Sequence, residues 1–233
     1  MVKNGRKVAV LFDLEDTLVQ TPWEDMQHVL EFRYQTRRKL IELGIPPSIL
    51  EGIERAALMR NKASEYVAEN FGKADAQRFH QEMERFLERY ELDSAQRSKL
   101  FLETIPTLEK IKRFEVKMGL VTNTSRKAVE TAFRLHDLKK YFDVVITREN
   151  VKKLKPDPEG VLLAIKKLAT KSFIMVGDLV HDALATKDAN GISIIVKRNL
   201  EKKLDFHADY FVQSLNEVPT IVQRVMRASG ERS

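Results

Sequence analysis

Acidic and hydroxyl residues directly follow a short apolar stretch near the start of the chain. Residues 8–12 read VAVLF, and behind them come Asp13, Glu15, Asp16 and Thr17. Carboxylates this closely spaced can act as nucleophile, as acid or base, or as oxygen ligands of a hard cation. An acidic turn that caps the next helix is the structural alternative, because Asp and Thr also favour turns and caps.

Three later stretches repeat the pattern of an apolar run that ends in polar residues. They place Thr122 and Asn123 in GLVTNTS, Lys155 in LKPDP, and Asp178 with Asp182 in MVGDLVHD. Each stretch alone also has a structural explanation. Thr122 fits an ordinary hydroxyl at the end of a strand, Lys155 fits a solvated lysine, and Asp178 and Asp182 fit acids at the start of a helix. The ordered set of acids, hydroxyl, lysine and acids favours a site, because ligands of open α/β sheets bind beyond the carboxyl ends of the strands.

The elements that must position these residues are predicted from the apolar patterns. Residues 8–12 form an unbroken apolar run, as expected of a strand buried on both faces. Further strands are predicted over residues 115–122, 142–147, 172–177, 193–196 and 209–212. Helices are predicted over residues 107–114, 125–138, 158–169 and 181–190, and a capping box at Ser214 and Glu217 begins a last helix. This alternation predicts a parallel sheet with helical crossovers.

Residues 19–103 differ from the rest because apolar residues recur there at helical spacing. We predict helices over residues 23–43, around 49–57, over 62–71, around 79–90 and around 94–101. The fold class is therefore α/β, a Rossmann-like parallel sheet sandwiched by helices, with an inserted all-α helical-bundle cap. Residues 1–18 and 104–233 would form the core domain, and residues 19–103 the cap domain.

Composition limits the function classes. The 233 residues include no cysteine, which excludes disulfides, thiol catalysis and thiolate metal sites. The net charge of +6 favours anionic partners, but the charges are interspersed and do not indicate nucleic acid. No apolar run is long enough to span a membrane, and the first apolar stretch runs into Asp13 without a cleavage site. We expect a cytoplasmic protein with no nucleic-acid or membrane partner.

With these motifs in order, the sequence resembles the haloacid dehalogenase-like (HAD) hydrolase superfamily. Its motifs match Asp13-Leu14-Glu15-Asp16-Thr17, Thr122, Lys155-Pro156-Asp157-Pro158, and Gly177-Asp178 with Asp182. A helical insertion between the first two motifs is similar to the cap of the phosphoglycolate phosphatase-like branch. The resemblance covers nearly the whole chain and implies a phosphatase that acts on a small phosphorylated metabolite.

The resemblance also implies roles for these residues. Asp13 would attack phosphorus and form an aspartyl-phosphate, and Glu15 would be the acid/base. Thr122, Asn123 and Lys155 would bind the substrate, with Thr122 and Lys155 also serving catalysis. Mg²⁺ would be the cofactor, held by Asp13, Asp178 and the backbone carbonyl of Glu15, with Asp182 as a ligand through water or as a support of the site.

Three positions depart from the family pattern, and two other functions stay open. Glu15 stands where the family usually has Asp, Asp16 replaces a common Gly, and Leu179 replaces Ser or Thr. One alternative is a 2-haloacid dehalogenase, which would also use Asp13. However, displacing a halide needs neither Mg²⁺ nor a general acid. The other alternative is a binding protein on a degenerate scaffold with little activity.

Two arginines lie on the predicted apolar stripe of the first cap helix. Arg33 and Arg37 share that stripe with Met26, Val29, Leu30, Leu40 and Ile41. One interpretation is that their aliphatic stems pack while the charged ends reach water. The other is that one or both point into the cleft and bind a carboxylate or second phosphate of the substrate.

Overall fold

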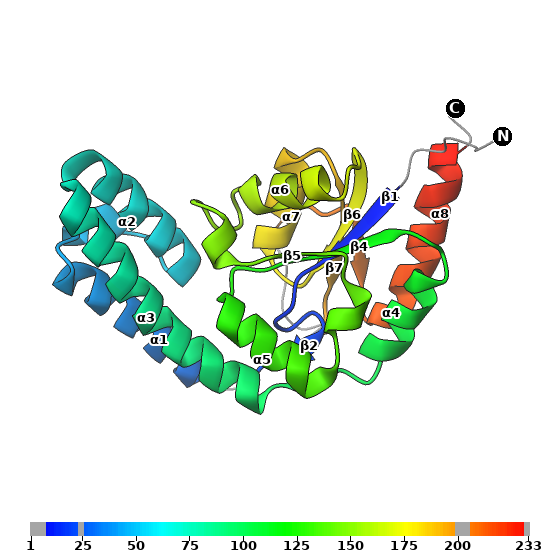
Figure 1. Ribbon diagram of the computed structural model, residues 1–233, viewed down its shortest axis with the longest axis horizontal. Coiled ribbons are helices and arrows are strands. Elements are labelled where there is room, and N and C mark those ends of the chain that lie inside the picture. Colours follow the sequence, from blue (N-terminus) through cyan, green and yellow to red (C-terminus); the bar gives the residue numbers. More distant parts are fainter. Residues whose placement is uncertain (1–7, 23–25, 199–205, 231–233) are drawn as a thin grey trace.

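A parallel sheet of six strands forms the centre of the computed structural model, which describes residues 8–22, 26–198 and 206–230 (Figure 1). The strand order is β5-β4-β1-β6-β7-β8, and every neighbouring pair is parallel. The strands are β1 (Val8–Phe12), β4 (Lys117–Val121), β5 (Val144–Ile146), β6 (Ser172–Gly177), β7 (Ile192–Val196) and β8 (Tyr210–Val212). The predicted α/β, Rossmann-like fold is confirmed.

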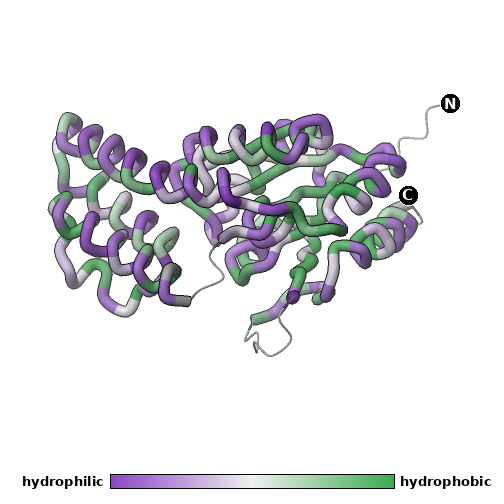
Figure 2. The backbone as a smooth tube through the Cα atoms, turned by 90° about the horizontal axis from the view of Figure 1, so that it is seen from below, coloured by the Kyte–Doolittle hydropathy of each residue, from purple (hydrophilic) through white to green (hydrophobic). Residues whose placement is uncertain are grey.

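All five residues of strand β1 are apolar because both faces of the strand are covered. Val8, Val10 and Phe12 pack on one side, in a cluster with residues of α4 (Thr104–Lys112), α5 (Arg126–His136) and α8 (Val218–Gly230). Ala9 and Leu11 pack on the other side, with α6 (Glu159–Lys167) and α7 (Val180–Asp188). Figure 2 shows mainly hydrophobic chain in the middle of this unit, flanked by helices in which hydrophobic and hydrophilic residues alternate. Successive side chains of a strand point to opposite faces, so the side chains of β1 pack into two separate hydrophobic cores.

Three helices lie to one side of this layered unit and have their own apolar core (Figure 1). We call them the cap helices: α1 (Met26–Glu42), α2 (Ala56–Asn70) and α3 (Lys73–Arg97). Leu40, Met59 and Phe79 contribute to this core from the three helices in turn. The far end of α3 instead packs along α5, and Ala95 belongs to the core of the sheet. The division into domains at residues 18 and 103 stays a prediction.

Three of the predicted cap helices are wrong in their boundaries. The segment around residues 49–57 is not one helix, because only Pro47–Leu50 forms a 3₁₀ turn and α2 begins at Ala56. The helices predicted around 79–90 and 94–101 are one continuous helix, α3, which ends at Arg97. No Gly or Pro interrupts α3, so nothing in its sequence ends the helix earlier.

The apolar stripe predicted for α1 is also wrong in part. Leu40 is fully buried, but Leu30 is 54% exposed and Ile41 is 39% exposed. The face that packs on α2 and α3 instead contains Phe32, Leu40 and Leu43. The Arg37 guanidinium donates to the carbonyl oxygens of Leu50, at 2.9 Å, and Ile53. Arg37 lines neither of the two cavities described below, so the structure adds no support to the interpretation in which it binds the substrate.

Short elements connect these parts. Strands β2 (Val19–Gln20) and β3 (Lys99–Leu100) pair antiparallel where the chain passes into and out of the cap helices. The predicted capping box of Ser214 and Glu217 is confirmed, although one 3₁₀ turn (Leu215–Glu217) precedes α8. Two further 3₁₀ turns cover Lys139–Tyr141 and Arg148–Asn150. Among the helices of the described residues, none is both long and apolar enough to cross a lipid bilayer.

Candidate active site

The carboxyl ends of β1, β4 and β6 and the loop after β5 converge on one cavity of about 150 Å³. Because parallel strands end at the same edge of the sheet, residues far apart in sequence meet there. Every candidate residue from the sequence lines this cavity: Asp13, Glu15, Thr122, Asn123, Lys155, Asp178 and Asp182. Their convergence into one cavity agrees with the sequence, whereas their chemical roles stay predictions.

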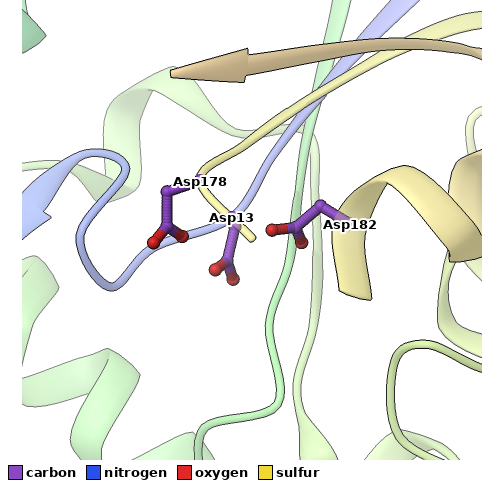
Figure 3. Close-up of side chains that lie close together, drawn as sticks. All are labelled: Asp13, Asp178 and Asp182. Carbon is purple, nitrogen blue, oxygen red and sulfur yellow. The ribbon is translucent and has the colours of Figure 1, made fainter. Parts of the chain in front are cut away.

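Three carboxylates form the centre of the cavity (Figure 3). Asp13 follows β1, Asp178 follows β6, and Asp182 lies in the first turn of α7. One oxygen from each lies within 4.8 Å of the others, as ligands of a single cation would. Asp13 Oδ1 is buried, and Lys155 Nζ lies 2.9 Å from it. Three carboxylate oxygens this close together fit a hard divalent cation.

Glycine at position 177 is required by the close approach of Asp182. A Cβ atom at Gly177 would lie 2.2 Å from Asp182 Cγ, closer than any side chain permits. Asp182 is held firmly there: Oδ2 accepts the N–H of Leu179 at 3.2 Å, and Oδ1 accepts Lys155 Nζ at 2.6 Å. Asp182 therefore has both oxygens engaged and is suited to support the site.

Lys155 is buried among the acids and holds two of them. Its ammonium donates to Asp182 and to the carbonyl of Val121 at 2.8 Å, and lies 2.9 Å from Asp13 Oδ1. Burial alone would lower the pKa of Lys155, but the charges of Asp13 and Asp182 outweigh this effect and raise it. The lysine therefore stays charged and offsets the repulsion between the carboxylates.

Burial and mutual repulsion raise the pKa values of the acids. Burial is the largest cause at Asp13, whose pKa rises to about 6 although Lys155 opposes the shift. Burial, followed by the charges of Asp182 and Asp13, raises the pKa of Asp178 well above its usual range. The pKa of Glu15 rises to about 8, through burial and then through the charges of Glu91 and Asp13. These carboxyl groups lack an adequate counter-charge, which a bound cation would supply.

Thr122 and Asn123 make contacts that the sequence did not indicate. The Thr122 hydroxyl donates to Thr124 Oγ1 at 3.1 Å, and Thr124 in turn hydrogen-bonds the Glu15 carboxyl group. The Asn123 amide accepts the N–H of Lys155 at 2.9 Å and donates to its carbonyl at 3.0 Å. Asn123 thus positions the backbone of Lys155. Direct contact of Thr122 and Asn123 with a substrate stays a prediction.

The loop after β1 is shaped by Asp16 and by a residue that sequence reasoning missed. Asp16 has a left-handed backbone (φ of 53°), as its tolerance for this conformation predicts, and its carboxylate caps Thr21. Arg198, beyond β7, donates to the carbonyls of Asp16 at 2.6 Å and Thr17 at 2.9 Å. Thr17 itself lies 3.4 Å from Asp178. Nothing in the sequence around Arg198 indicates that it contacts the loop after β1.

The cap helices reach the site through residues that were also missed. Asn61 on α2 pairs with both backbone groups of Leu154, at 2.8 and 2.9 Å, directly before Lys155. Arg55 lies 3.5 Å from His181, and its charge adds to burial in lowering the pKa of His181 to about 4. His181 also lines the cavity. Arg33 lines neither this cavity nor the larger one beside it.

Comparisons with known proteins agree on the family. A sequence model of the haloacid dehalogenase-like hydrolases matches residues 10–196. Pyrophosphatase PpaX of Bacillus mycoides is 27% identical over 226 residues, which cover 93% of this chain and 97% of that protein.

Solved structures extend the comparison to the fold. A HAD phosphatase from Thermococcus onnurineus superposes with a TM-score of 0.57 at 27% identity, covering 92% of this chain and 97% of that one. A 2-haloacid dehalogenase from Pseudomonas syringae pv. Tomato has a TM-score of 0.56 at 23% identity, with coverages of 94% and 99%. At that identity the second likeness concerns the fold alone.

Proposed function

Because the chain belongs to the haloacid dehalogenase-like hydrolases, we propose that it is a Mg²⁺-dependent phosphatase of a small phosphorylated metabolite. The observation that carries this proposal is the convergence of Asp13, Asp178 and Asp182 beside the buried Lys155. Halide displacement would use Asp13, but it would not explain why Asp178 and Asp182 lie beside it. Residues 19–103 would act as a cap over this site.

The reaction divides into two displacements at phosphorus. In the first, the Asp13 carboxylate attacks, the phosphorus–oxygen ester bond breaks, and Glu15 gives its proton to the leaving oxygen. In the second, Glu15 takes a proton from water, whose oxygen attacks the aspartyl-phosphate and releases phosphate and free Asp13. A pKa near 8 supports the first role, because the Glu15 carboxyl group holds its proton at neutral pH.

The remaining residues hold these groups in line. Lys155 fixes Asp13 and Asp182 and places positive charge where the phosphoryl oxygens would lie. Asp13, Asp178 and the backbone carbonyl of Glu15 would hold Mg²⁺, and Asp182 would support the set. When bound, Mg²⁺ would offset the negative charge of the phosphoryl group and orient it for in-line attack.

Phosphate release tests the proposal directly. With p-nitrophenyl phosphate we expect hydrolysis that requires Mg²⁺ and stops on chelation, and a set of phosphorylated metabolites then identifies the substrate. Relatives named pyrophosphatase make inorganic pyrophosphate one member of that set. Chloride release from 2-chloropropionate without Mg²⁺ would instead assign the dehalogenase reaction. No release of phosphate or of chloride would favour a degenerate scaffold.

Metal binding should stabilise the protein apart from any activity. The three carboxyl groups lie within 4.8 Å of one another only in the folded protein, so a cation that binds between them binds the folded state preferentially. At a hundred times its dissociation constant, Mg²⁺ would add about 2.7 kcal/mol to the free energy of unfolding. This is roughly 5–10 °C in melting temperature, measured by calorimetry. Asp178→Asn should lose most of the shift and the exposed Asp188→Asn should keep it. Equal shifts in the two variants would exclude this site.

Arg198 should matter for turnover because it holds two carbonyls of the loop that carries Asp13 and Glu15. In Arg198→Lys a single ammonium cannot span both carbonyls, since it lacks the planar fork of arginine. We expect kcat to fall about tenfold, as for the loss of one charged hydrogen bond, with KM little changed. Arg134→Lys, on the exposed face of α5, is the control. Unchanged kcat together with a lower melting temperature would leave Arg198 a structural role only.

A further inference from the structure

A second cavity opens from the acidic one toward the cap helices. Its volume is about 320 Å³, and it shares Glu15, Asp16, Asn123, Thr124 and Leu179 with the acidic cavity. A leaving group attached to a phosphoryl group at Asp13 would therefore extend into it. We call this space the leaving-group chamber.

The volume of the chamber is larger than the volume that a second phosphate group would occupy. At about 30 Å³ for a water molecule, it holds on the order of ten water-sized groups. A phosphate would fill only about half of that space. Its walls are largely apolar, with these residues at the surface: Val29, Phe32, Ala57, Leu87, Tyr90 and Leu154. The rings of Phe32 and Tyr90 lie 5.2 Å apart. Apolar walls of this kind favour an apolar ligand body.

The positive charges that line the chamber are already paired. Arg148 donates to Glu84 at 2.7 Å and also pairs with Glu91, while Arg60 lies 3.4 Å from Glu84. Two arginines thus face two glutamates, and among the described residues no other Lys or Arg lines the chamber. An anionic leaving group would meet no unpaired cation there, and it would lie beside Glu91.

One buried donor of a residue that lines the chamber lacks a partner. Arg148 is 1% exposed, and its Nη2 has no hydrogen-bond partner among the described residues. A buried N–H that is left unpaired costs stability, and a ligand acceptor placed there recovers that loss. Since the charge of Arg148 is already balanced, an uncharged acceptor such as a ring nitrogen, carbonyl or hydroxyl is sufficient.

We propose that the leaving group is uncharged and largely apolar, and that it offers one hydrogen-bond acceptor to Arg148. The substrate would then be an organic phosphate monoester and not a diphosphate. This inference rests on the proposed phosphatase function, and it makes Arg148 and the chamber walls the determinants of substrate choice.

Matched substrates test the inference by the rate of phosphate release. The probes are benzyl phosphate, its three pyridylmethyl isomers, acetyl phosphate and inorganic pyrophosphate. We expect kcat/KM for the benzyl-type esters to exceed that for pyrophosphate at least tenfold. We also expect one pyridylmethyl isomer to exceed benzyl phosphate about tenfold, the gain expected from one hydrogen bond to a charged donor. Arg148→Lys keeps the charge but should abolish that second preference.

A variant that fills the chamber tests its walls separately. Ala57→Phe should lower the ratio of kcat/KM for benzyl phosphate to that for acetyl phosphate at least tenfold. Ala68→Phe, the same change on the exposed face of α2, should leave the ratio as it is. An unchanged ratio in Ala57→Phe, or pyrophosphate as the best of all probes, would overturn the inference while the phosphatase function stands. No hydrolysis of any probe would overturn the phosphatase function, and the inference with it.

Discussion

Replacing Asp13 by Asn is expected to lower kcat for p-nitrophenyl phosphate by about 10⁵-fold or more, to the background rate. The amide has neither the nucleophilic oxygen that forms the aspartyl-phosphate nor the charge of a hard ligand. In wild-type protein quenched during turnover, the acylphosphate should be detectable as acid-stable, hydroxylamine-labile phosphate. In Asp13→Asn it should be absent.

Folding of this variant is the necessary control. Asn has almost the shape of Asp, and it removes a carboxylate whose burial raises its pKa, so the far-UV circular dichroism should be retained. Asp188→Asn makes the same chemical change at an exposed position of α7 and should keep full activity. Substantial turnover by a folded Asp13→Asn would overturn the mechanism, because no other residue has been assigned to attack phosphorus.

Glu15→Gln is expected to produce the second-largest loss, and one that depends on the leaving group. For alkyl phosphates, whose leaving oxygen needs a proton, kcat should fall about 10²–10⁴-fold, the usual range for a lost general acid or base. For p-nitrophenyl phosphate the first displacement should survive, while breakdown of the aspartyl-phosphate becomes slow. Stopped-flow measurement should then show a burst of p-nitrophenol close to one equivalent of enzyme, followed by slow turnover.

The outcomes of the Glu15 variants separate three interpretations. Equal losses for all leaving groups, with no burst, would assign Glu15 a structural role. Glu15→Asp tests the departure from the family pattern, because it moves the same group closer to the backbone. A faster Glu15→Asp would mean that the longer side chain is a handicap, and a slower one that Thr124 and its neighbours fit glutamate. Glu130→Gln, on the exposed face of α5, is the matched control.

The sequence was most informative where one physical requirement determines the residue type. Residues 8–12 are all apolar because β1 is central and covered on both faces, and this requirement is visible without coordinates. The polar residues behind each strand were recognisable for a similar reason. Parallel strands bring their carboxyl ends to one edge, so the order of motifs predicts a shared site. Asp13, Lys155 and Asp182 meet there as expected.

The cap helices were harder to predict because their neighbours decide which face is buried. On α1 several stripes are almost equally apolar, and only packing on α2 and α3 selects the one that contains Leu40. Arg148 shows the same limit for a functional residue. Its glutamate partners lie on α3, 57 and 64 positions earlier in the chain, and no local pattern relates them. Such contacts depend on tertiary structure and leave no periodic signal.

The pairing of β2 with β3 has a consequence for modularity. Val19 lies opposite Leu100, so the chain departs from the catalytic unit and rejoins it at points about 5 Å apart. We expect the segment between these residues to behave as a cassette with adjoining ends, whose length imposes little strain on the sheet. The catalytic edge could therefore accept a cassette of another shape without losing its geometry. In such an arrangement, exchange of a single continuous segment could change the metabolite that is bound while the catalytic residues of the sheet stay the same.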